Sequence, residues 1–498
     1  MSKTVENLLR AQEAVAAKSA QVREGRWRPR FHFAPPCGWM NDPNGCVFFR
    51  GRYHIFYQFN PYAPVWGTMH WGHAVSDDLI HWEHLPVALA PGETYDGTVP
   101  EPGGCFSGTA IVHEDRLYLF YTGVSKRESG DGETTYVQTQ CMAWSDDGVV
   151  FTKYEGNPVL TAPEGFPESD FRDPKVWRHG DAFYMLCGAK RGAYGCVLLF
   201  RSDDLLQWRF VNVMAQSRGE WGSMWECPDF FELDGEEVLL FSPIGVGARK
   251  ATYMTGHLDY ETGRFLCRTN GEVDWGMDFY APQTLLDGAG RRIVFGWANA
   301  WQWMPWWRTW EPTPQEGWCG SFALPRELRV MDGRLRIVPV RELERLRTRR
   351  LLPEKCVEDV ADTPLVLPEA ECFELRARLD LRRTSASRVD LLLRAGGERA
   401  TVVSLDLRRW ELTVDRSRAD EWSGGSCSNL LALCDKNFLD VHLFVDRNLI
   451  EVFADEYTQA CSCCIYPERE QRGNLIEAAG GVAVFERLEM WELAGEGR

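Results

Sequence analysis

The chain of 498 residues carries a formal net charge of −17, with 44% hydrophobic and 12% aromatic residues. This length exceeds one ordinary hydrophobic core and predicts two domains, or a repeat architecture followed by a smaller module. Excess negative charge disfavours binding to nucleic acid or to an anionic membrane surface, so we expect neither partner and favour a small-molecule ligand.

The N-terminal residues 1–27 mix Glu, Lys and Arg and lack an apolar run of signal-peptide length, which predicts a short polar helix without an export signal. No run of about eighteen apolar residues free of charge follows, so we expect no transmembrane span. The sixteen cysteines are therefore expected to be reduced, in a cytoplasmic protein. Their one tight cluster, Cys461-x-Cys463-Cys464, lacks the paired C-x-x-C spacing of a zinc site and is interpreted as core or surface thiols.

From about Arg30, short runs of β-branched and aromatic residues alternate with Gly, Asp and Pro, a pattern typical of an all-β protein. The tripeptide S-D-D recurs at Ser76, Ser145 and Ser202, each time with an aromatic residue six places after the serine, and a weaker candidate copy lies near His257. Repeats about sixty residues apart suit four-stranded propeller blades, of which residues 30–330 would hold about five. The alternative is that S-D-D marks only a common hairpin turn.

The segment Trp39-Met40-Asn41-Asp42-Pro43-Asn44-Gly45 places one carboxylate on a stiff turn. Pro43 fixes its own φ and Asn44-Gly45 tolerates a sharp bend, so Asp42 can be aimed at a ligand. In isolation the motif is better explained by an Asx turn between two strands, in which Asp42 only binds its own backbone. Two later carboxylate motifs favour a functional role: Phe171-Arg172-Asp173-Pro174 and Trp225-Glu226-Cys227-Pro228-Asp229.

In type and in order, these three motifs resemble those of the β-fructosidases, family 32 of the glycoside hydrolases, which include invertases, sucrose-6-phosphate hydrolases, levanases and inulinases. The resemblance covers nearly everything from Arg28 to the C-terminus. It is carried further by YHIFYQFNP from Tyr53, WGTMHWGHAVSDDLIHW from Trp66, GCFSGTA from Gly104, FGWANAW from Phe295, LPREL from Leu324 and VDRNLIEVFAD from Val445.

The resemblance implies a five-bladed β-propeller followed by a C-terminal β-sandwich. The expected boundaries are a polar helical segment at 1–27, the propeller at 28–335, a linker at 336–352 and the sandwich at 353–498, for which we expect a structural or oligomer-forming role. Whether the chain forms a homo-oligomer stays open.

The activity that the resemblance implies is retaining hydrolysis of the β-fructofuranosidic bond of sucrose, sucrose 6-phosphate or short fructo-oligosaccharides, without metal or organic cofactor. Carried over motif by motif, Asp42 would be the nucleophile, Glu226 the general acid and base, and Asp173 the residue that stabilises the oxocarbenium-like transition state. The sequence neighbours of Glu226 would desolvate it, and Arg172 would hold Asp173 ionised through a bidentate contact.

Sugar binding needs polar hydrogen-bonding groups and aromatic surfaces, and nine residues on family-like motifs are expected around the fructosyl ring: Trp39, Met40, Asn41, Gln58, Trp66, Phe106, Ser107, Arg172 and Trp297. The run Phe241-Ser242-Pro243-Ile244-Gly245 departs from the FSPQG of relatives, so a polar contact would be missing. The aromatic side chains Trp301, Trp303, Trp306, Trp307 and Trp310 would rim the pocket, as a stacking platform or as a self-packed lid.

A phosphate on the glucosyl unit would need cations at the rim, for which the candidates are Lys190, Arg191, Arg249, Lys250 and Arg308. Solvated surface charge is the alternative for each of them. Two other functions stay open, a fructosyltransferase with the same residues and a sugar-binding protein without catalysis. The intact Asp42, Asp173 and Glu226 count against the second.

Overall fold

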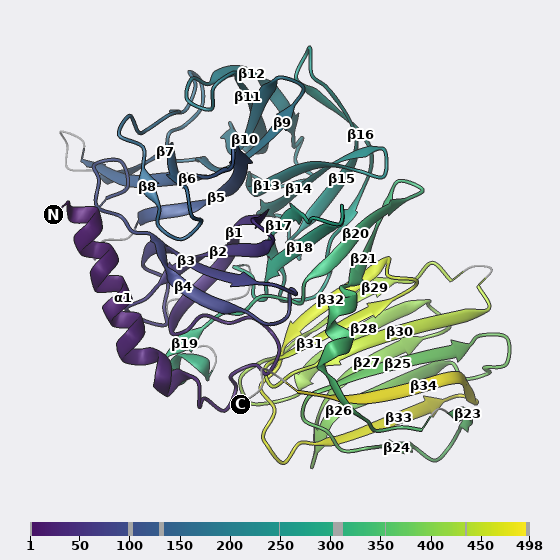
Figure 1. Cartoon of the computed structure of the whole chain (residues 1–498). Coiled ribbons are helices and arrows are strands. Elements are labelled where there is room, and N and C mark those ends of the chain that lie inside the picture. Colours follow the sequence, from purple (N-terminus) through teal and green to yellow (C-terminus); the bar gives the residue numbers. More distant parts are fainter. Residues whose placement is uncertain are drawn as a thin grey trace.

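The computed structural model describes residues 2–97, 103–128, 134–248, 250–301, 312–353, 355–433 and 436–494, and most of them lie in β-strands (Figure 1). One α-helix, α1 (Lys3–Val22), occurs in these ranges and lies along the flank of the first sheet, next to β4 (Glu83–Leu89). Its surface is largely polar, and Asn7 and Ala11 are buried, with the Asn7 amide donating a hydrogen bond to the Pro91 carbonyl (2.9 Å). No described helix has both the length and the apolar character needed to cross a membrane.

The first part of the chain forms groups of four antiparallel strands, five of them within the described residues. The first two groups are joined by a short parallel pairing of β3 with β5, and β19 (Trp318–Cys319) pairs in parallel with β1. The groups are β1 (Gly38–Phe49), β2 (Arg52–Asn60), β3 (Thr68–Ser76) and β4; β5 (Gly103–His113), β6 (Arg116–Glu128), β7 (Thr134–Ser145) and β8 (Thr152–Lys153); β9 (Phe171–His179), β10 (Ala182–Arg191), β11 (Tyr194–Ser202) and β12 (Arg209–Gln216); β13 (Met224–Leu233), β14 (Glu236–Ile244), β15 (Thr252–Asp259) and β16 (Arg264–Glu272); and β17 (Tyr280–Leu286), β18 (Arg292–Trp297), β20 (Arg326–Met331) and β21 (Arg334–Pro339).

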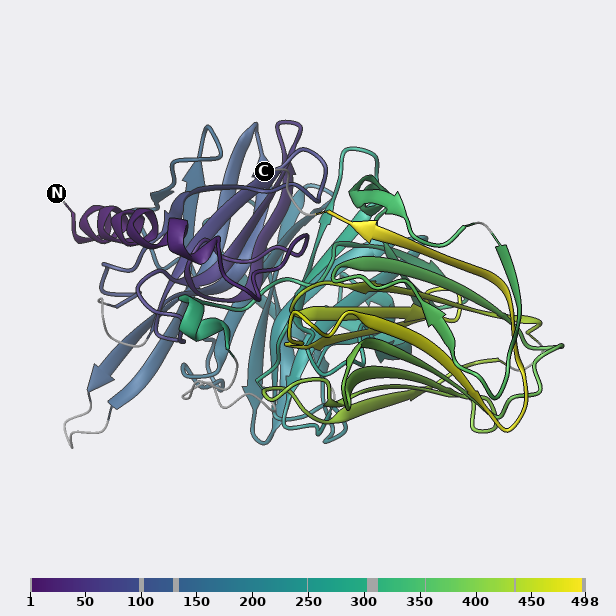
Figure 2. The same cartoon turned by 90° about the horizontal axis from the view of Figure 1, so that it is seen from below.

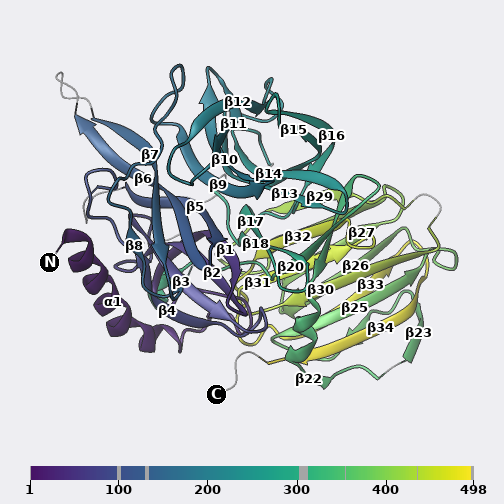
Figure 3. The same cartoon turned by 45° about the horizontal axis from the view of Figure 1, so that its top comes forward.

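The first strands of the five groups gather around one centre (Figure 3). Strand β1 contacts β5, β5 contacts β9, β9 contacts β13, β13 contacts β17, and β17 returns to β1. The ring of contacts is therefore closed, and residues far apart in sequence meet at its centre.

The S-D-D repeats form the turn that follows the third strand of three groups. Ser76, Ser145 and Ser202 end β3, β7 and β11, and in each case the serine hydroxyl accepts a hydrogen bond from a backbone amide two or three residues later. Side-chain oxygens that bind nearby backbone amides stabilise such turns, which explains why the tripeptide recurs with the period of the groups.

The second part of the chain forms two antiparallel sheets, which lie beside the first part (Figure 2). Their inner faces share one hydrophobic core that includes Leu391 from the six-stranded sheet and Leu443 from the seven-stranded sheet. The seven-stranded sheet contains β22 (Arg347–Arg350), β23 (Lys355–Val360), β25 (Phe373–Asp380), β30 (Phe438–Val445), β31 (Leu449–Ala454), β32 (Gln459–Cys464) and β34 (Ala483–Leu493). The six-stranded sheet contains β24 (Leu365–Leu367), β26 (Arg388–Gly396), β27 (Arg399–Asp406), β28 (Glu411–Arg418), β29 (Ser426–Leu430) and β33 (Gly473–Ala479).

The segment predicted as a linker, 336–352, is mostly ordered secondary structure. Its first residues belong to β21, which ends at Pro339, so the predicted boundary at 335 falls inside that strand. The 3₁₀-helix η2 (Arg341–Leu346) and β22 follow at once. A second 3₁₀-helix, η1 (Thr313–Glu316), precedes β19.

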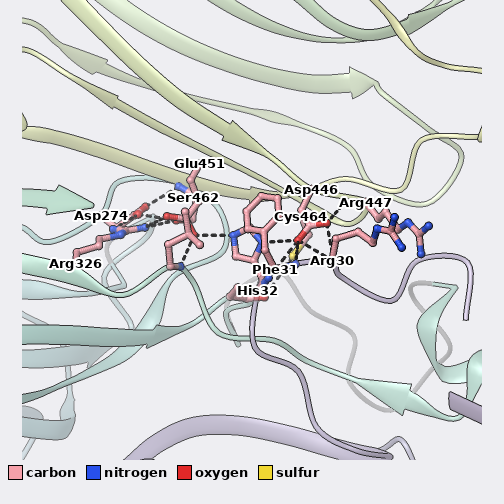
Figure 4. Close-up of polar contacts among 12 residues, drawn as sticks. Arg30, Phe31, His32, Asp274, Arg326, Asp446, Arg447, Glu451, Ser462 and Cys464 are labelled. Atoms are coloured by element: carbon pink, nitrogen blue, oxygen red, sulfur yellow. Dashed lines mark hydrogen bonds and ion pairs between the residues drawn. The ribbon is translucent and has the colours of Figure 1, made fainter. Parts of the chain in front are cut away.

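A buried network of charged side chains holds the two parts together (Figure 4). His32 lies between two carboxylates of the second part, with Nδ1 2.9 Å from Asp446 and Nε2 3.2 Å from Glu451. Arg326 forms ion pairs at 2.8 Å with both Glu451 and Asp274. Burial opposes the charge of His32, but the hydrogen bonds and charges of the two carboxylates outweigh it and raise the pKa of His32 to about 9.

Candidate active site

Each of the five inner strands is interrupted by a β-bulge at the same place in its group. The register with the neighbouring strand shifts between Met40 and Pro43 in β1, between Phe106 and Gly108 in β5, opposite Leu186 and Gly188 in β9, between Glu226 and Asp229 in β13, and between Tyr280 and Gln283 in β17. Four of the bulges contain an Xaa-Pro pair: Asp42-Pro43, Asp173-Pro174, Cys227-Pro228 and Ala281-Pro282. Proline lacks the amide donor of a regular ladder and is tolerated at such bulges.

The bulges aim side chains at the centre of the ring, as bulges do when they redirect a strand. Asp173, Cys227 and Ala281 have φ values of 61°, 46° and 51°, in the left-handed region. Each bulge contains one of Asp42, Ser107, Asp173, Cys227 and Ala281. The residue just before it lines one central cavity of about 470 Å³, which gives Asn41, Phe106, Arg172, Glu226 and Tyr280. Asp42, Ser107 and Asp173 line the same cavity, together with Gln58, Trp66, Ile244, Gly245 and Trp301.

Asp42 lines the cavity and is almost fully buried, with an exposed fraction of 8%. Its Oδ2 accepts hydrogen bonds from the Ser107 hydroxyl (2.7 Å) and the Cys227 thiol (3.4 Å), whereas Oδ1 has no hydrogen-bond partner among the described residues. Burial and the charge of Glu226 outweigh these hydrogen bonds and raise the pKa of Asp42 to about 6. One carboxylate oxygen is thus held by two donors, while the other is buried and has no hydrogen-bond partner among the described residues.

Glu226 is held by two donors from neighbouring inner strands. Arg172 donates to its Oε1 from Nε (3.2 Å) and Nη2 (2.8 Å), and the Tyr280 hydroxyl donates to Oε2. The expectation that Arg172 grips Asp173 is wrong in this respect, since Nε is 3.9 Å from the Asp173 carboxylate. At the bulge both residues line the cavity, and the Arg172 guanidinium reaches across to Glu226 on the next inner strand instead.

The sequence predicted that the neighbours of Glu226 in the chain would shield it from water, and for Trp225 the structure shows otherwise. Trp225 points away from the cavity, where its ring stacks on Phe241 at 4.0 Å and its Nε1 donates to the Trp221 carbonyl. The walls around Glu226 come from other strands, through Arg172 and Tyr280.

Asp173 is buried and its Oδ2 accepts a hydrogen bond from the backbone amide of Cys227 (2.9 Å). Its own backbone amide donates to the Thr122 hydroxyl (2.9 Å), which fixes the bulge. Burial outweighs the attraction of Arg172, and the neighbouring charge of Glu226 adds to it, so the pKa of Asp173 is raised to about 7.

The predicted sugar-binding residues fall into two sets. Asn41, Gln58, Trp66, Phe106, Ser107 and Arg172 line the cavity. Trp39, Met40 and Trp297 are buried and are not among the described residues that line it. Trp39 instead supports Asn41, donating from its indole nitrogen to the amide oxygen (2.8 Å), and packs against Trp297 and Trp301.

Tyr280 was not predicted from the sequence, although its bulge carries the same signal as the others. In Tyr280-Ala281-Pro282, as in Arg172-Asp173-Pro174, a lining residue precedes the bulge position and a proline follows it. Ala281 has no carboxylate, so the tripeptide carries no sign of catalytic chemistry. Trp301 lines the cavity as predicted, while Trp303, Trp306, Trp307 and Trp310 lie outside the described residues.

Of the cations proposed for phosphate binding, none lines the cavity within the described part of the chain, where Arg172 is the one Lys or Arg of the lining. Lys250 is buried and donates to the Ala248 carbonyl (2.5 Å), and Lys190 and Arg191 lie at the end of β10. Arg249 and Arg308 lie outside the described residues.

Comparison with known proteins places both parts of the chain in one family. Residues 32–339 match the glycosyl hydrolases family 32 N-terminal domain, and residues 342–492 match the glycosyl hydrolases family 32 C terminal domain. A sucrose-6-phosphate hydrolase of Zymomonas mobilis is 36% identical over 99% of this chain and 97% of its own length. A raffinose invertase of Escherichia coli is 38% identical over 97% of this chain and 98% of its own.

A solved structure shows the same likeness in three dimensions. A mutant of the Bombyx mori GH32 beta-fructofuranosidase in complex with sucrose is 34% identical to this chain and superposes with a TM-score of 0.81. The match covers 98% of each chain.

Proposed function

The chain belongs to family 32 of the glycosyl hydrolases, and from this membership we propose that it is a β-fructofuranosidase that hydrolyses sucrose or sucrose 6-phosphate and releases fructose. The observation that carries the proposal is the convergence of Asp42, Asp173 and Glu226, from three different sheets, on one cavity of about 470 Å³. Glycoside hydrolysis needs carboxyl groups that act as nucleophile and as proton donor on one bond.

Asp42 is the proposed nucleophile, which attacks the anomeric carbon of the fructosyl unit. Its Oδ2 is fixed by Ser107 and Cys227, which leaves Oδ1 as the oxygen with no hydrogen-bond partner among the described residues. A nucleophile held at one oxygen is oriented without losing the lone pairs it needs for attack.

Glu226 is the proposed general acid in the first step and general base in the second. In the first step the proton moves from Glu226 to the glycosidic oxygen as the bond to the leaving group breaks, and a fructosyl ester forms on Asp42. In the second step Glu226 takes a proton from water, which displaces Asp42 and releases fructose with retained configuration. Arg172 and Tyr280, which hold its two oxygens, are proposed as positioning residues.

Asp173 is proposed to bind fructose hydroxyls and to stabilise the transition state. Its Oδ2 is held by the Cys227 amide, which anchors the side chain beside the proposed nucleophile. A hydrogen bond that strengthens as positive charge develops on the ring lowers the barrier rather than only tightening binding.

We also propose that the five strand groups are the blades of a five-bladed β-propeller and that the two later sheets form a β-sandwich, with the division near residues 335–352 expected from the sequence. The closed ring of contacts among β1, β5, β9, β13 and β17 supports the first assignment, and the hydrophobic core shared by the two later sheets supports the second.

We further propose that the protein is cytoplasmic. Fourteen cysteines of the described part carry free thiols, thirteen of them buried or half-buried, and free thiols are typical of a reducing compartment.

Liberation of glucose from sucrose tests the proposal directly. The wild-type protein should release glucose and fructose from sucrose. Asp42→Asn should lower the rate of glucose release by several orders of magnitude, since the covalent step is lost. Binding of sucrose without turnover by the wild-type protein would make it a sugar-binding protein instead, and accumulation of fructosyl-sucrose in place of free fructose would make it a transferase.

A comparison of KM for sucrose and sucrose 6-phosphate decides between the two substrates. If a cation recognises the phosphate, KM for sucrose 6-phosphate should be clearly lower than KM for sucrose. Neutralising the candidates in turn should then identify the residue whose loss erases the difference while sucrose hydrolysis persists: Lys190, Arg191, Arg249, Lys250 and Arg308. Equal KM values would show that the phosphate is not recognised and would make the protein a plain β-fructofuranosidase.

A further inference from the structure

Three cysteines from two different sheets meet at one edge of the second part of the chain. Cys427 lies on β29 of the six-stranded sheet, and Cys461 and Cys463 lie on β32 of the seven-stranded sheet. The sulfur of Cys427 is 3.7 Å from those of Cys461 and Cys463, which are 3.8 Å from each other. We call these three residues the thiol triad. Cys427 precedes Cys461 by 34 positions and Cys463 by 36, so the triad matches no C-x-x-C pattern.

The alternation of the strand selects which cysteines take part. Cys461 and Cys463 are two residues apart and therefore point to the same face of β32. Cys464 points to the other face, where its sulfur lies 3.3 Å from the Ala298 carbonyl. It is as deeply buried as its neighbours, so burial alone does not bring a cysteine into the triad.

The sulfur spacing suits a tetrahedral metal ion. In a tetrahedral zinc–thiolate site with Zn–S bonds of about 2.3 Å, the sulfurs are about 3.8 Å apart. The triad has this spacing on all three sides. Three thiolates are also the donors that soft and borderline ions prefer, while a fourth position would be left for water.

The surroundings supply a route and a counter-charge. Cys427 is only half-buried, so an ion can enter from its side, whereas Cys461 and Cys463 are buried. The buried Arg416 guanidinium donates to the Cys464 carbonyl (2.7 Å), beside the triad, and is paired with Asp278 (2.6 Å). Because Asp278 already pairs with this guanidinium, Arg416 offsets the net negative charge of three thiolates around a divalent ion only in part.

We propose that Cys427, Cys461 and Cys463 form a tri-thiolate site that binds one Zn²⁺, with water as the fourth ligand. Binding releases the three thiol protons to solvent and changes no oxidation state. The site is separate from the catalytic cavity, whose lining includes none of the three cysteines. Its bound ion would link the edges of the two sheets and stabilise the second part of the chain.

The test uses the full-length protein, reduced and stripped of metal. Zn²⁺ is titrated against a chromophoric chelator, and Co²⁺ is titrated as a spectroscopic probe whose thiolate-to-cobalt charge-transfer band reports sulfur ligation. We expect one ion per chain, and a loss of affinity beyond about 100-fold in Cys427→Ser and Cys461→Ser, since even outer-shell changes cost about 10- to 100-fold. Cys464→Ser, an equally buried neighbour outside the triad, should keep the wild-type affinity and the cobalt band.

Sucrose hydrolysis by each variant verifies that it is folded, and Cys427→Ser, at the half-buried position, is the variant expected to fold most readily. Zn²⁺ should also raise the thermal unfolding temperature of the wild-type protein and of Cys464→Ser, but not of the two triad variants. The proposal is overturned if the reduced wild-type protein binds no ion, if the triad variants bind Zn²⁺ as the wild type does, or if peptide mapping finds two triad cysteines joined in a disulfide in the protein isolated from cells.

Discussion

At the scale of single residues, Tyr280 is the residue whose proposed role is most open to a direct test. Its hydroxyl donates to Oε2 of Glu226, so Tyr280→Phe should misplace the proton donor. A hydrogen bond to a charged group is worth about 1.5–3 kcal/mol, which predicts a fall in kcat for sucrose of about 10- to 100-fold.

Because Tyr280 acts through Glu226, this loss should shrink for a fructoside with an activated leaving group, which needs little acid assistance. Tyr53→Phe is the matched control, since that hydroxyl binds Asp287 away from the cavity. An equal loss for good and poor leaving groups would assign Tyr280 to substrate binding rather than to positioning Glu226.

The titration of Asp42 gives a second prediction. The nucleophile must be ionised, and burial raises its pKa to about 6, so kcat/KM for sucrose should rise as the pH increases through about 6. The hydrogen bond from Ser107 lowers this pKa, so Ser107→Ala should shift the acidic limb of the profile to higher pH. A limb that stays in place, or moves to lower pH, would contradict the role of Ser107 in holding Asp42 ionised.

Much of the site was predictable at this scale, and the exceptions share a cause. The motifs around Asp42, Asp173 and Glu226 placed all three carboxylates in one cavity because each motif carries a chemically distinctive side chain. A bidentate contact of Arg172 was predicted with Asp173 because the two are adjacent in sequence, whereas the guanidinium forms its hydrogen bonds with Glu226 and only a long ion pair with Asp173. Contacts between strands depend on register, which one sequence does not reveal.

At the scale of the element, the bulges of the inner strands determine where the side chains point. In β5 the bulge contains Ser107-Gly108, and a Cβ added to Gly108 would lie 1.9 Å from the Phe120 carbonyl oxygen of β6. Gly108→Ala must therefore push the two strands apart and carry Ser107 away from Asp42.

We expect Gly108→Ala to lower the free energy of unfolding by about 1–3 kcal/mol, the usual cost of overpacking, and to lower kcat for sucrose as well. Urea unfolding and initial-rate kinetics measure the two effects. Gly424→Ala is the control, because no heavy atom lies within 4 Å of its added Cβ. Wild-type activity in Gly108→Ala would show that the bulge of β5 does not position Ser107.

The sequence signal for these bulges is an Xaa-Pro pair inside a run that otherwise resembles a strand. At Asp42-Pro43 the sequence predicted a stiff turn, whereas the structure has a bulge inside β1, and Ala281-Pro282 was not predicted as a special site. The S-D-D turns were a better guide to the period of the strand groups, because the local hydrogen bonds of serine and aspartate need no tertiary partner.

At the scale of the whole molecule, the network around His32 links stability to pH. The pKa of His32 is about 9 in the folded protein and about 6.5 when unfolded, so its contribution is complete below about 6.5 and is lost as the pH rises through about 9. The free energy of unfolding should therefore fall between these values, by at most about 1.4 kcal/mol per pH unit from this group.

Urea unfolding across this pH range measures the effect, in the wild-type protein and in His32→Gln. His81→Gln replaces an exposed histidine that binds Asp78 on the surface, and it is the matched control. A wild-type protein whose stability does not change between pH 6.5 and pH 9, or a His32→Gln variant that keeps the wild-type slope, would contradict the link between His32 and the second part of the chain.

At this scale the sequence predicted only those features that depend on local patterns of residues, such as the presence of strands. Short β-branched runs predicted a mostly β structure, and most of the described residues do lie in strands. The predicted boundary at 335 falls inside β21, which continues through Arg336-Ile337-Val338-Pro339, and the basic run begins only after it, at Arg341. The thiol triad was also invisible, because Cys427 joins Cys461 and Cys463 only when two sheets are packed face to face.

The central claim is that Asp42 forms a covalent bond with the fructosyl unit while Glu226 transfers protons. The most direct measurement is mass spectrometry of Glu226→Gln after brief exposure to fructosyl fluoride, whose leaving group needs no general acid. Without its general base the second step is slow, so one fructosyl unit should be found on the peptide that contains Asp42, and added azide should release it as a β-fructosyl azide. An unmodified protein that still turns the substrate over, or a fructosyl unit on any other residue, would contradict the account.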